Sequence, residues 1–194
     1  NRARSELAID LRFDLRNALQ PLGDRKRIAK YLLEAEQLAD RLGDKQRMGW
    51  VQSYLTEQFW MLGRYAESAA AGELALSAAR ELHDVPLQVV TNLPLGLAHH
   101  TRGDYVAANR YFGWNAAELK GHLAGERFGM FVLPSSFARS FLGWGLADMG
   151  KFGEAYAIGE EALQIAESNR HPFSIGYAHL GLGVIAMRQG HFRR

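Results

Sequence analysis

The chain contains no cysteine, only five prolines, a formal net charge of +2 and no long apolar run. The lack of cysteine excludes disulfides and thiolate metal sites, which suits a reducing cytoplasm. No apolar stretch reaches the roughly 18 residues that a membrane-spanning helix needs, so no membrane partner is expected. A small arginine excess explains the basic isoelectric point and is weak support for a nucleic-acid partner.

Glycine, in contrast, recurs at a regular interval. The glycines at positions 23, 63, 103, 150 and 190 stand 40, 40, 47 and 40 residues apart. A period of roughly 20–50 residues is typical of stacked repeat proteins, in which each repeat packs on its neighbours. The spacing predicts one continuous domain over residues 1–194 with about four and a half repeats.

The segments between these glycines have the apolar period of α-helices. After Gly23, apolar residues recur at steps of three and four: Ile28, Leu32, Ala35, Leu38, Ala39 and Leu42. Gly43 can end that helix in the left-handed conformation, and Asp44 can cap the next, which is expected over about residues 45–62. Pro94 lies within a helical pattern, so we expect it to kink that helix or to shift its start.

The resulting unit of helix A, glycine turn and helix B resembles the tetratricopeptide repeat (TPR). Three pairs match the Leu-Gly of helix A: Leu95-Gly96, Leu142-Gly143 and Leu182-Gly183. Four aromatic residues match the one that follows the glycine turn: Tyr65, Tyr105, Phe152 and Phe192. The resemblance implies an all-α solenoid, a right-handed superhelix of antiparallel helix pairs. Helix A would line its concave surface.

The period of 40 exceeds the 34 residues of ordinary TPRs. Long-period arrays with Leu-Gly-Asp helix ends, as at Leu42-Gly43-Asp44, resemble the helper regions of large bacterial signalling ATPases. The opening stretch over residues 8–19, followed by Pro21-Leu22-Gly23, resembles the first repeat after the ATPase module of multidomain nucleotide-cyclase-type regulators. The chain begins within a helical pattern and stops just after the fifth glycine turn, so we interpret it as a piece of a longer protein. The 47-residue step requires an insertion, placed between Gly121 and Pro134. It is either a ligand-contacting loop or, our preferred interpretation, two extra helical turns packed by Phe128, Phe131 and Leu133.

No residue set indicates catalysis, a metal or a cofactor. Glycine pairs such as Gly143-Trp144-Gly145 lie inside helical patterns, where close helix packing explains them better than a dinucleotide loop. Adjacent His99 and His100 point about 100° apart on a helix and cannot easily chelate one ion. Glu160-Glu161 fits a solvated helix face. Basic residues near the start alternate with acidic ones, which favours a salt-bridged surface over a nucleic-acid site.

The concave surface is the better candidate for binding. The register set by the glycine turns predicts that ten helix A residues point inward: Phe13, Trp50, Glu57, Trp60, Leu97, His100, Phe137, Trp144, Tyr177 and Met187. Aromatic side chains supply large contact areas at little entropic cost and dominate binding hot spots. The alternative is that they pack between long helices. Aromatic and aliphatic residues at the expected clamp positions disfavour recognition of a C-terminal carboxylate.

The sequence therefore favours a non-enzymatic scaffold for protein–protein interaction within a larger cytoplasmic signalling regulator, with a cyclase or ATPase domain elsewhere in the parent. Its partner would be a protein, a peptide or another domain of the parent chain. The alternative is a small-molecule sensor of the kind found in ATP-dependent transcription activators, with a pocket lined by Trp50, Trp60 and Trp144. The helix over 172–189 lacks a following helix B, so we expect either self-association through one apolar face or marginal stability of the chain. That face consists of Ile175, Ala178, Leu182, Ile185 and Ala186.

Overall fold

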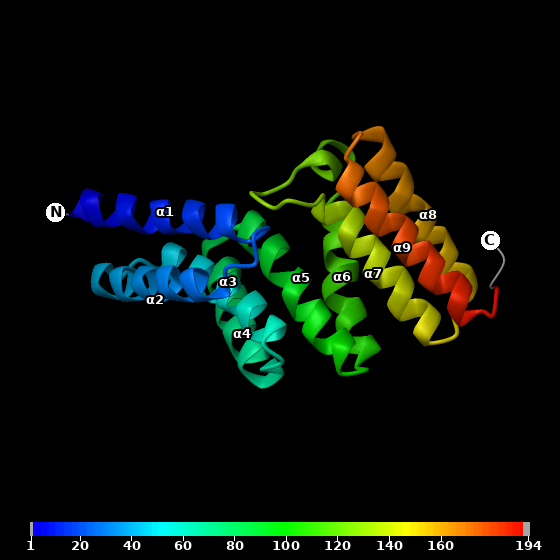
Figure 1. The fold of residues 1–194 in the computed structure, drawn as a ribbon, viewed down its shortest axis with the longest axis horizontal. Coiled ribbons are helices and arrows are strands. Elements are labelled where there is room, and N and C mark those ends of the chain that lie inside the picture. Colours follow the sequence, from blue (N-terminus) through cyan, green and yellow to red (C-terminus); the bar gives the residue numbers. More distant parts are fainter. Residues whose placement is uncertain (1, 192–194) are drawn as a thin grey trace. The chain divides into compact units, whose positions relative to one another are not determined.

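A computed structural model describes residues 2–191, and the described chain is all α-helical, without a β-strand, as expected (Figure 1). The α-helices are α1 (Arg2–Leu19), α2 (Arg25–Leu42), α3 (Lys45–Met61), α4 (Tyr65–Leu82), α5 (Val85–Thr101), α6 (Tyr105–Glu118), α7 (Pro134–Asp148), α8 (Phe152–Ser168) and α9 (Pro172–Arg188). A short 3₁₀ helix, η1, covers Gly121–Gly125. None of the described helices is long and apolar enough to cross a lipid bilayer.

The helices form two compact units, residues 1–94 and 95–194, with the boundary inside α5 at Pro94. In the first unit α1 packs on α2, α2 on α3 and α3 on α4. In the second unit α6 packs on α7, α7 on α8, and α9 on both α7 and α8. Packing between helices that follow one another in the chain is the arrangement of an α-solenoid. Because α5 starts at Val85 and continues through Pro94, the proline does not shift the start of the helix.

The periodic glycines adopt the backbone conformation that the turns require. Their φ angles lie between 67° and 86°, a region that residues with a Cβ rarely enter. At four of the five turns the N–H after the glycine donates to a carbonyl five residues earlier, as from Arg64 to Phe59 (2.8 Å) and from Lys151 to Leu146 (2.9 Å). This hydrogen bond closes the helix end as in a Schellman motif. Phe192, which matches the aromatic position of the last repeat, lies outside the described residues.

Small residues set the spacing between helices. The core of the first unit contains Ala35 and Ala39 of α2, and that of the second contains Ala147 and Ala155. A Cβ added to Gly143 would lie 3.0 Å from the carbonyl oxygen of Ala155, and one on Gly181 would lie 3.3 Å from Ser140 Cβ. Close helix packing therefore explains these glycines, as the sequence indicated, whereas Gly183 has open space.

The preferred interpretation of the insertion was wrong, because α6 ends at Glu118 and no extra helical turns of it follow. The segment forms η1 and then a loop that reaches Pro134. Positive φ angles at Gly121, Phe128 and Gly129 prevent a continuous helix there. The end of the loop is nevertheless fixed, since Leu133 is buried and its N–H donates to Ser174 Oγ at the start of α9 (2.9 Å).

Candidate aromatic binding surface

The ten predicted groove residues fall into two groups, one in each unit. Phe13, Trp50, Glu57 and Trp60 belong to the first unit, and the other six belong to the second. The first group is anchored in the packing of α1 and α3, and most of the second group lies in a continuous series of ring contacts.

In the first unit, Tyr54 of α3 brings two of the candidates together. Phe13 contacts it edge-on, with ring centroids 5.2 Å apart, and Trp50 lies at 5.8 Å. Phe13 also packs against the core cluster that contains Ile9. Trp60 is half-buried. The Phe13–Tyr54 contact therefore joins α1 to α3, whereas Trp50 contacts Tyr54 within α3 itself.

Glu57 neutralises a buried cation. Its carboxylate pairs with the guanidinium of Arg16 and accepts a hydrogen bond from Gln20 Nε2 (2.7 Å). The Arg16 guanidinium also lies 4.3 Å from the centre of the Tyr54 ring. Burial lowers the pKa of Arg16 to about 10, because water is kept from the charged form. Glu57 thus serves the α1–α3 contact and is already occupied by partners from its own unit.

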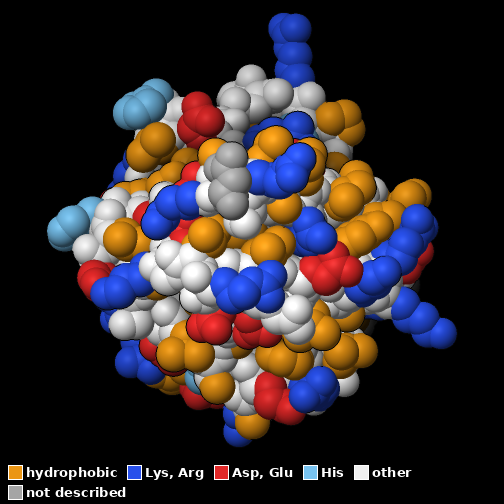
Figure 2. All heavy atoms as spheres, turned by 90° about the vertical axis from the view of Figure 1, so that its left-hand side faces the viewer, with side chains coloured by type: hydrophobic (Ala, Val, Ile, Leu, Met, Phe, Trp, Pro, Cys, Tyr) orange, Lys and Arg blue, Asp and Glu red, His pale blue; other side chains and the backbone are white. Residues whose placement is uncertain are grey.

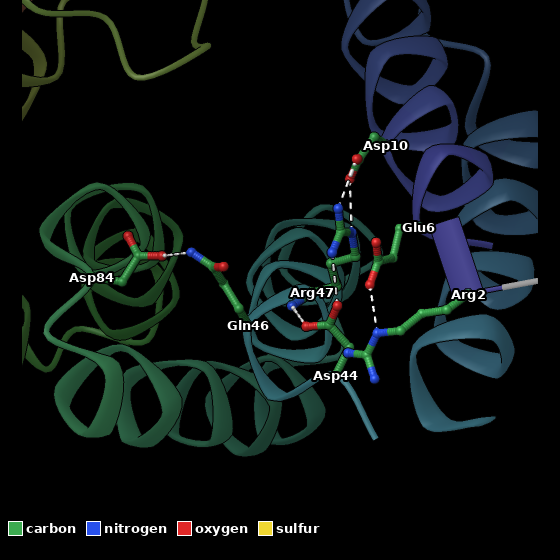
Figure 3. A network of polar contacts seen from close by, with 7 residues as sticks. All are labelled: Arg2, Glu6, Asp10, Asp44, Gln46, Arg47 and Asp84. Carbon is green, nitrogen blue, oxygen red and sulfur yellow. Dashed lines mark hydrogen bonds and ion pairs between the residues drawn. The ribbon is translucent and has the colours of Figure 1, made fainter. Parts of the chain in front are cut away.

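A second polar network joins the same helices (Figure 3). Arg47 of α3 donates to Asp10 of α1 (2.8 Å) and to Asp44, the N-cap of α3 (2.7 Å). These hydrogen bonds raise the pKa of Arg47 above its usual range. Figure 2 shows basic, acidic and apolar side chains interspersed over one face. The salt-bridged surface expected from the alternating charges is thus present in α1 and α2, where Arg12 pairs with Glu34 (2.7 Å).

In the second unit, eight rings form a continuous series that we call the aromatic row. It runs through Tyr105, His100, Trp144, Phe141, Phe137, Tyr177, Phe173 and Phe131. Adjacent ring centroids lie 4.8–5.5 Å apart. The row joins α5, α6, α7, α9 and the loop before α7. Four of the predicted groove residues are therefore brought together here: His100, Phe137, Trp144 and Tyr177.

The row is packed at its centre and open at one end. Phe137 is buried, while His100, Trp144 and Tyr177 are half-buried. At the open end Phe173 is 47% exposed and Phe131 is 40% exposed. Leu97 is buried, and Met187 is 48% exposed and lies outside the row. The open end offers apolar ring surface that a partner can cover.

Sequence reasoning missed half of the row: Tyr105, Phe141, Phe173 and Phe131. Two of these had a detectable signal. Phe141 lies four residues after Phe137 and three before Trp144, and Phe173 lies four before Tyr177, so each shares a helix face with a predicted residue. Phe131 had no such signal, because its loop reaches Phe173 only through the fold.

The opposite end of the row carries a polar cluster from three helices. Arg188 Nε of α9 donates to Asp148 Oδ1 of α7 (2.6 Å), and Asp148 Oδ2 lies 3.7 Å from Nε2 of His100. His99 points elsewhere and approaches Asp104 (3.2 Å), as expected for adjacent helical residues. The described residues contain no group of three potential ligands placed to hold a metal ion.

A buried arginine changes the interpretation of the Glu160-Glu161 pair. Glu160 is exposed, as expected for a solvated helix face. Glu161 Oε1 instead lies 2.9 Å from Nε of Arg139. Arg139 is buried, with only 1% of the residue exposed. No sequence pattern indicates this contact, because Arg139 lies on α7 and Glu161 lies on α8.

Two surface hollows are lined by residues that do not belong to the row. One, of about 460 Å³, lies among α2, α3 and α4 and includes Met48, Gly49 and Leu74. The other, of about 530 Å³, lies between α8 and α9 and includes Leu182, Ala186 and Met187. Neither hollow is lined by a tryptophan.

The prediction that one apolar face of α9 has no packing partner is wrong for three of its five residues. Ala178, Ile185 and Ala186 are buried, because α9 packs against both α7 and α8. The exposed apolar residues of α9 are Phe173, Leu180 and Met187. A different strip of the helix is therefore available for association.

Comparison with known proteins gives no further guide to the site. Neither the models of protein families nor the curated proteins searched match the chain. The aromatic row and its polar end are thus the features from which a function can be inferred.

Proposed function

We propose that the chain is a TPR-like scaffold whose second unit binds the apolar face of a protein partner along the aromatic row. The observation that carries this proposal is the open end of the row, where Phe131 and Phe173 expose their rings beside the half-buried Tyr177. Partly exposed aromatic rings on a rigid helical base are typical of binding hot spots. The helices beneath fix the rings before a partner arrives, which limits the entropy lost on binding.

The chemistry of the row narrows the kind of partner. Arg188, a cation near the His100 end of the row, already pairs with Asp148. It is therefore not free to bind a terminal carboxylate or a phosphate, and the rings favour apolar and aromatic groups. A peptide segment or another domain of a longer parent chain fits this chemistry.

The TPR assignment is part of the same proposal. It is supported by the left-handed glycine turns, by the close approach of α7 and α8 at Gly143, and by the packing of α9 on α7. The long-period resemblance suggests that the parent is a cytoplasmic signalling regulator with an ATPase or nucleotide-cyclase module. In that setting the row would dock a domain of the regulator or a second protein.

A peptide library displayed on phage tests the proposal directly. Peptides selected on the wild-type chain should be rich in aromatic and aliphatic residues. Their binding should fall at least tenfold for Phe173→Ser and for Tyr177→Ser. Leu180→Ser is the matched control, because Leu180 is 54% exposed on the same helix but lies outside the row.

The contrary outcomes are equally specific. Selected peptides that bind all three variants equally would place any binding surface elsewhere and overturn the proposal. If no peptide is selected, a metabolite panel in a thermal-shift assay provides the next test. A saturable stabilisation that Trp144→Phe removes would replace the scaffold with the small-molecule sensor.

A further inference from the structure

His100 occupies an unusual position at the closed end of the aromatic row. Three rings surround its imidazole edge-on: Tyr105 of α6 at 5.1 Å, and Phe141 and Trp144 of α7 at 6.0 Å and 5.0 Å. Its side chain is only 11% exposed. A histidine enclosed by aromatic rings packs like an apolar side chain while it is neutral. Once it is protonated, it becomes a buried charge.

The polar atoms near the imidazole are incompletely matched. Nε2 of His100 and Oδ2 of Asp148 are both buried and lack a hydrogen-bond partner within the described chain, and the 3.7 Å between them is too long for a hydrogen bond. The other oxygen of Asp148 is held by Arg188. Buried polar atoms without partners are uncommon in native structures, because each one gives up the hydrogen bonds that it makes in water.

The charged groups near His100 give little net stabilisation to its protonated form. The anion closest to the ring within the described chain is Asp148 on α7, and Arg188 on α9 already pairs with it. On α5 itself, the adjacent His99 pairs with Asp104, and Tyr105 of α6 presents an uncharged ring. A proton on His100 would therefore add an uncompensated charge to an aromatic cage.

We propose that His100 is an acid-sensitive latch between α5 and α7, neutral and seated among the rings at neutral pH and expelled from the cage when it is protonated. Its release would uncover Trp144 and Tyr105 and loosen the closed end of the row. The latch belongs to the free protein and does not depend on the row binding a partner.

The direction of the pH effect follows from the burial of His100 among the three rings. Burial lowers the pKa of His100 below its ordinary value; Asp148 opposes this shift and Arg188 adds to it. A histidine with a depressed folded-state pKa contributes stability that is present above its ordinary pKa near 6.5. That contribution is lost as the pH falls from about 6.5 through the lower folded-state pKa.

The decisive experiment is an NMR titration of the imidazole signals in the full chain, with His100→Phe used to assign the His100 signal. A short unstructured histidine peptide, titrated under the same conditions, serves as the reference. The midpoint of His100 should lie below that of the peptide. Arg188→Gln should raise the His100 midpoint, because Asp148 becomes free to pair with the imidazolium, and Asp148→Asn should lower it further.

Tryptophan fluorescence reports the release itself. Acidification should change the emission of the wild-type chain with the His100 midpoint, and Trp144→Phe should remove that change. If His100 titrates together with the reference peptide, or if Arg188→Gln leaves the His100 midpoint unchanged, the latch is overturned. Should His100→Phe fail to fold, His100→Gln provides the assignment independently of the Arg188→Gln measurement.

Discussion

At the scale of single residues, Arg139 shows how a charge is accommodated inside the second unit. Its guanidinium donates to Ser135 Oγ (2.7 Å) and to the carbonyl of Ala116 (2.7 Å), and Glu161 lies beside its Nε. The arginine thereby links the end of α6 to α7 and α8. Glu161 remains 45% exposed, so water shares in its solvation.

We predict that Arg139→Ala destabilises the protein by about 3–5 kcal/mol, because it leaves the buried acceptors at Ser135 and Ala116 without their donor and opens a cavity. Glu161→Gln should cost less than about 1 kcal/mol, since the glutamine Oε1 can still accept from Arg139 Nε and water reaches this half-exposed position. Urea denaturation followed by circular dichroism measures both. Equal losses in the two variants would mean that the ion pair, and not the hydrogen bonds to Ser135 and Ala116, holds Arg139 in place.

At the scale of helices, glycine has two separate roles in this chain. In the turns it provides positive φ angles, and within helices it allows close approach. Gly96 of α5 illustrates the second role, since a Cβ there would lie 2.5 Å from Cε1 of the fully buried Phe112. Gly113 of α6 has nothing within 4 Å of the same added atom.

These two glycines form a matched pair for substitution. We predict that Gly96→Ala destabilises the protein by about 1–3 kcal/mol through overpacking against Phe112. Gly113→Ala should stabilise it by roughly 0.5–1 kcal/mol, because alanine loses less backbone entropy in a helix. Thermal unfolding of both variants provides the measurement. A stable Gly96→Ala variant would show that Phe112 can move aside at little cost.

At the scale of the whole molecule, the exposed apolar surface of the second unit bears on assembly. Leu180 and Met187 of α9 are each about half exposed, and Met187 borders the hollow of about 530 Å³. The sequence predicted self-association at this end from a different set of residues. Because the exposed apolar residues of α9 are Phe173, Leu180 and Met187, the prediction of self-association now applies to them.

We therefore predict concentration-dependent association of the chain through α9. Met187→Lys should weaken it about tenfold or more, because burying a methionine is worth about 1.5–3 kcal/mol and 1.4 kcal/mol corresponds to tenfold. Sedimentation velocity over a range of concentrations measures the effect. Leu62→Lys is the control, since Leu62 is 59% exposed in the first unit. A wild-type chain that stays monomeric throughout would contradict the prediction.

The sequence by itself determined the helical architecture, because its signals are local. A glycine with positive φ can end a helix whatever lies around it, and apolar residues at steps of three and four define a helix face without knowledge of the partner. The same periodicity placed Phe137 and Trp144 on one face of α7. The same spacing puts Phe141 on that face of α7 as well.

Only the tertiary structure decided which faces meet. The contact of Phe131 with Phe173, the bond from Leu133 to Ser174 and the pairing of Asp148 with Arg188 each join residues about 40 positions apart. Such contacts depend on how far helices approach and how they rotate against one another, which small residues such as Gly143 and Ala155 control jointly. A one-dimensional pattern carries no record of that joint geometry, so the aromatic row and the cage around His100 emerge only in the folded chain.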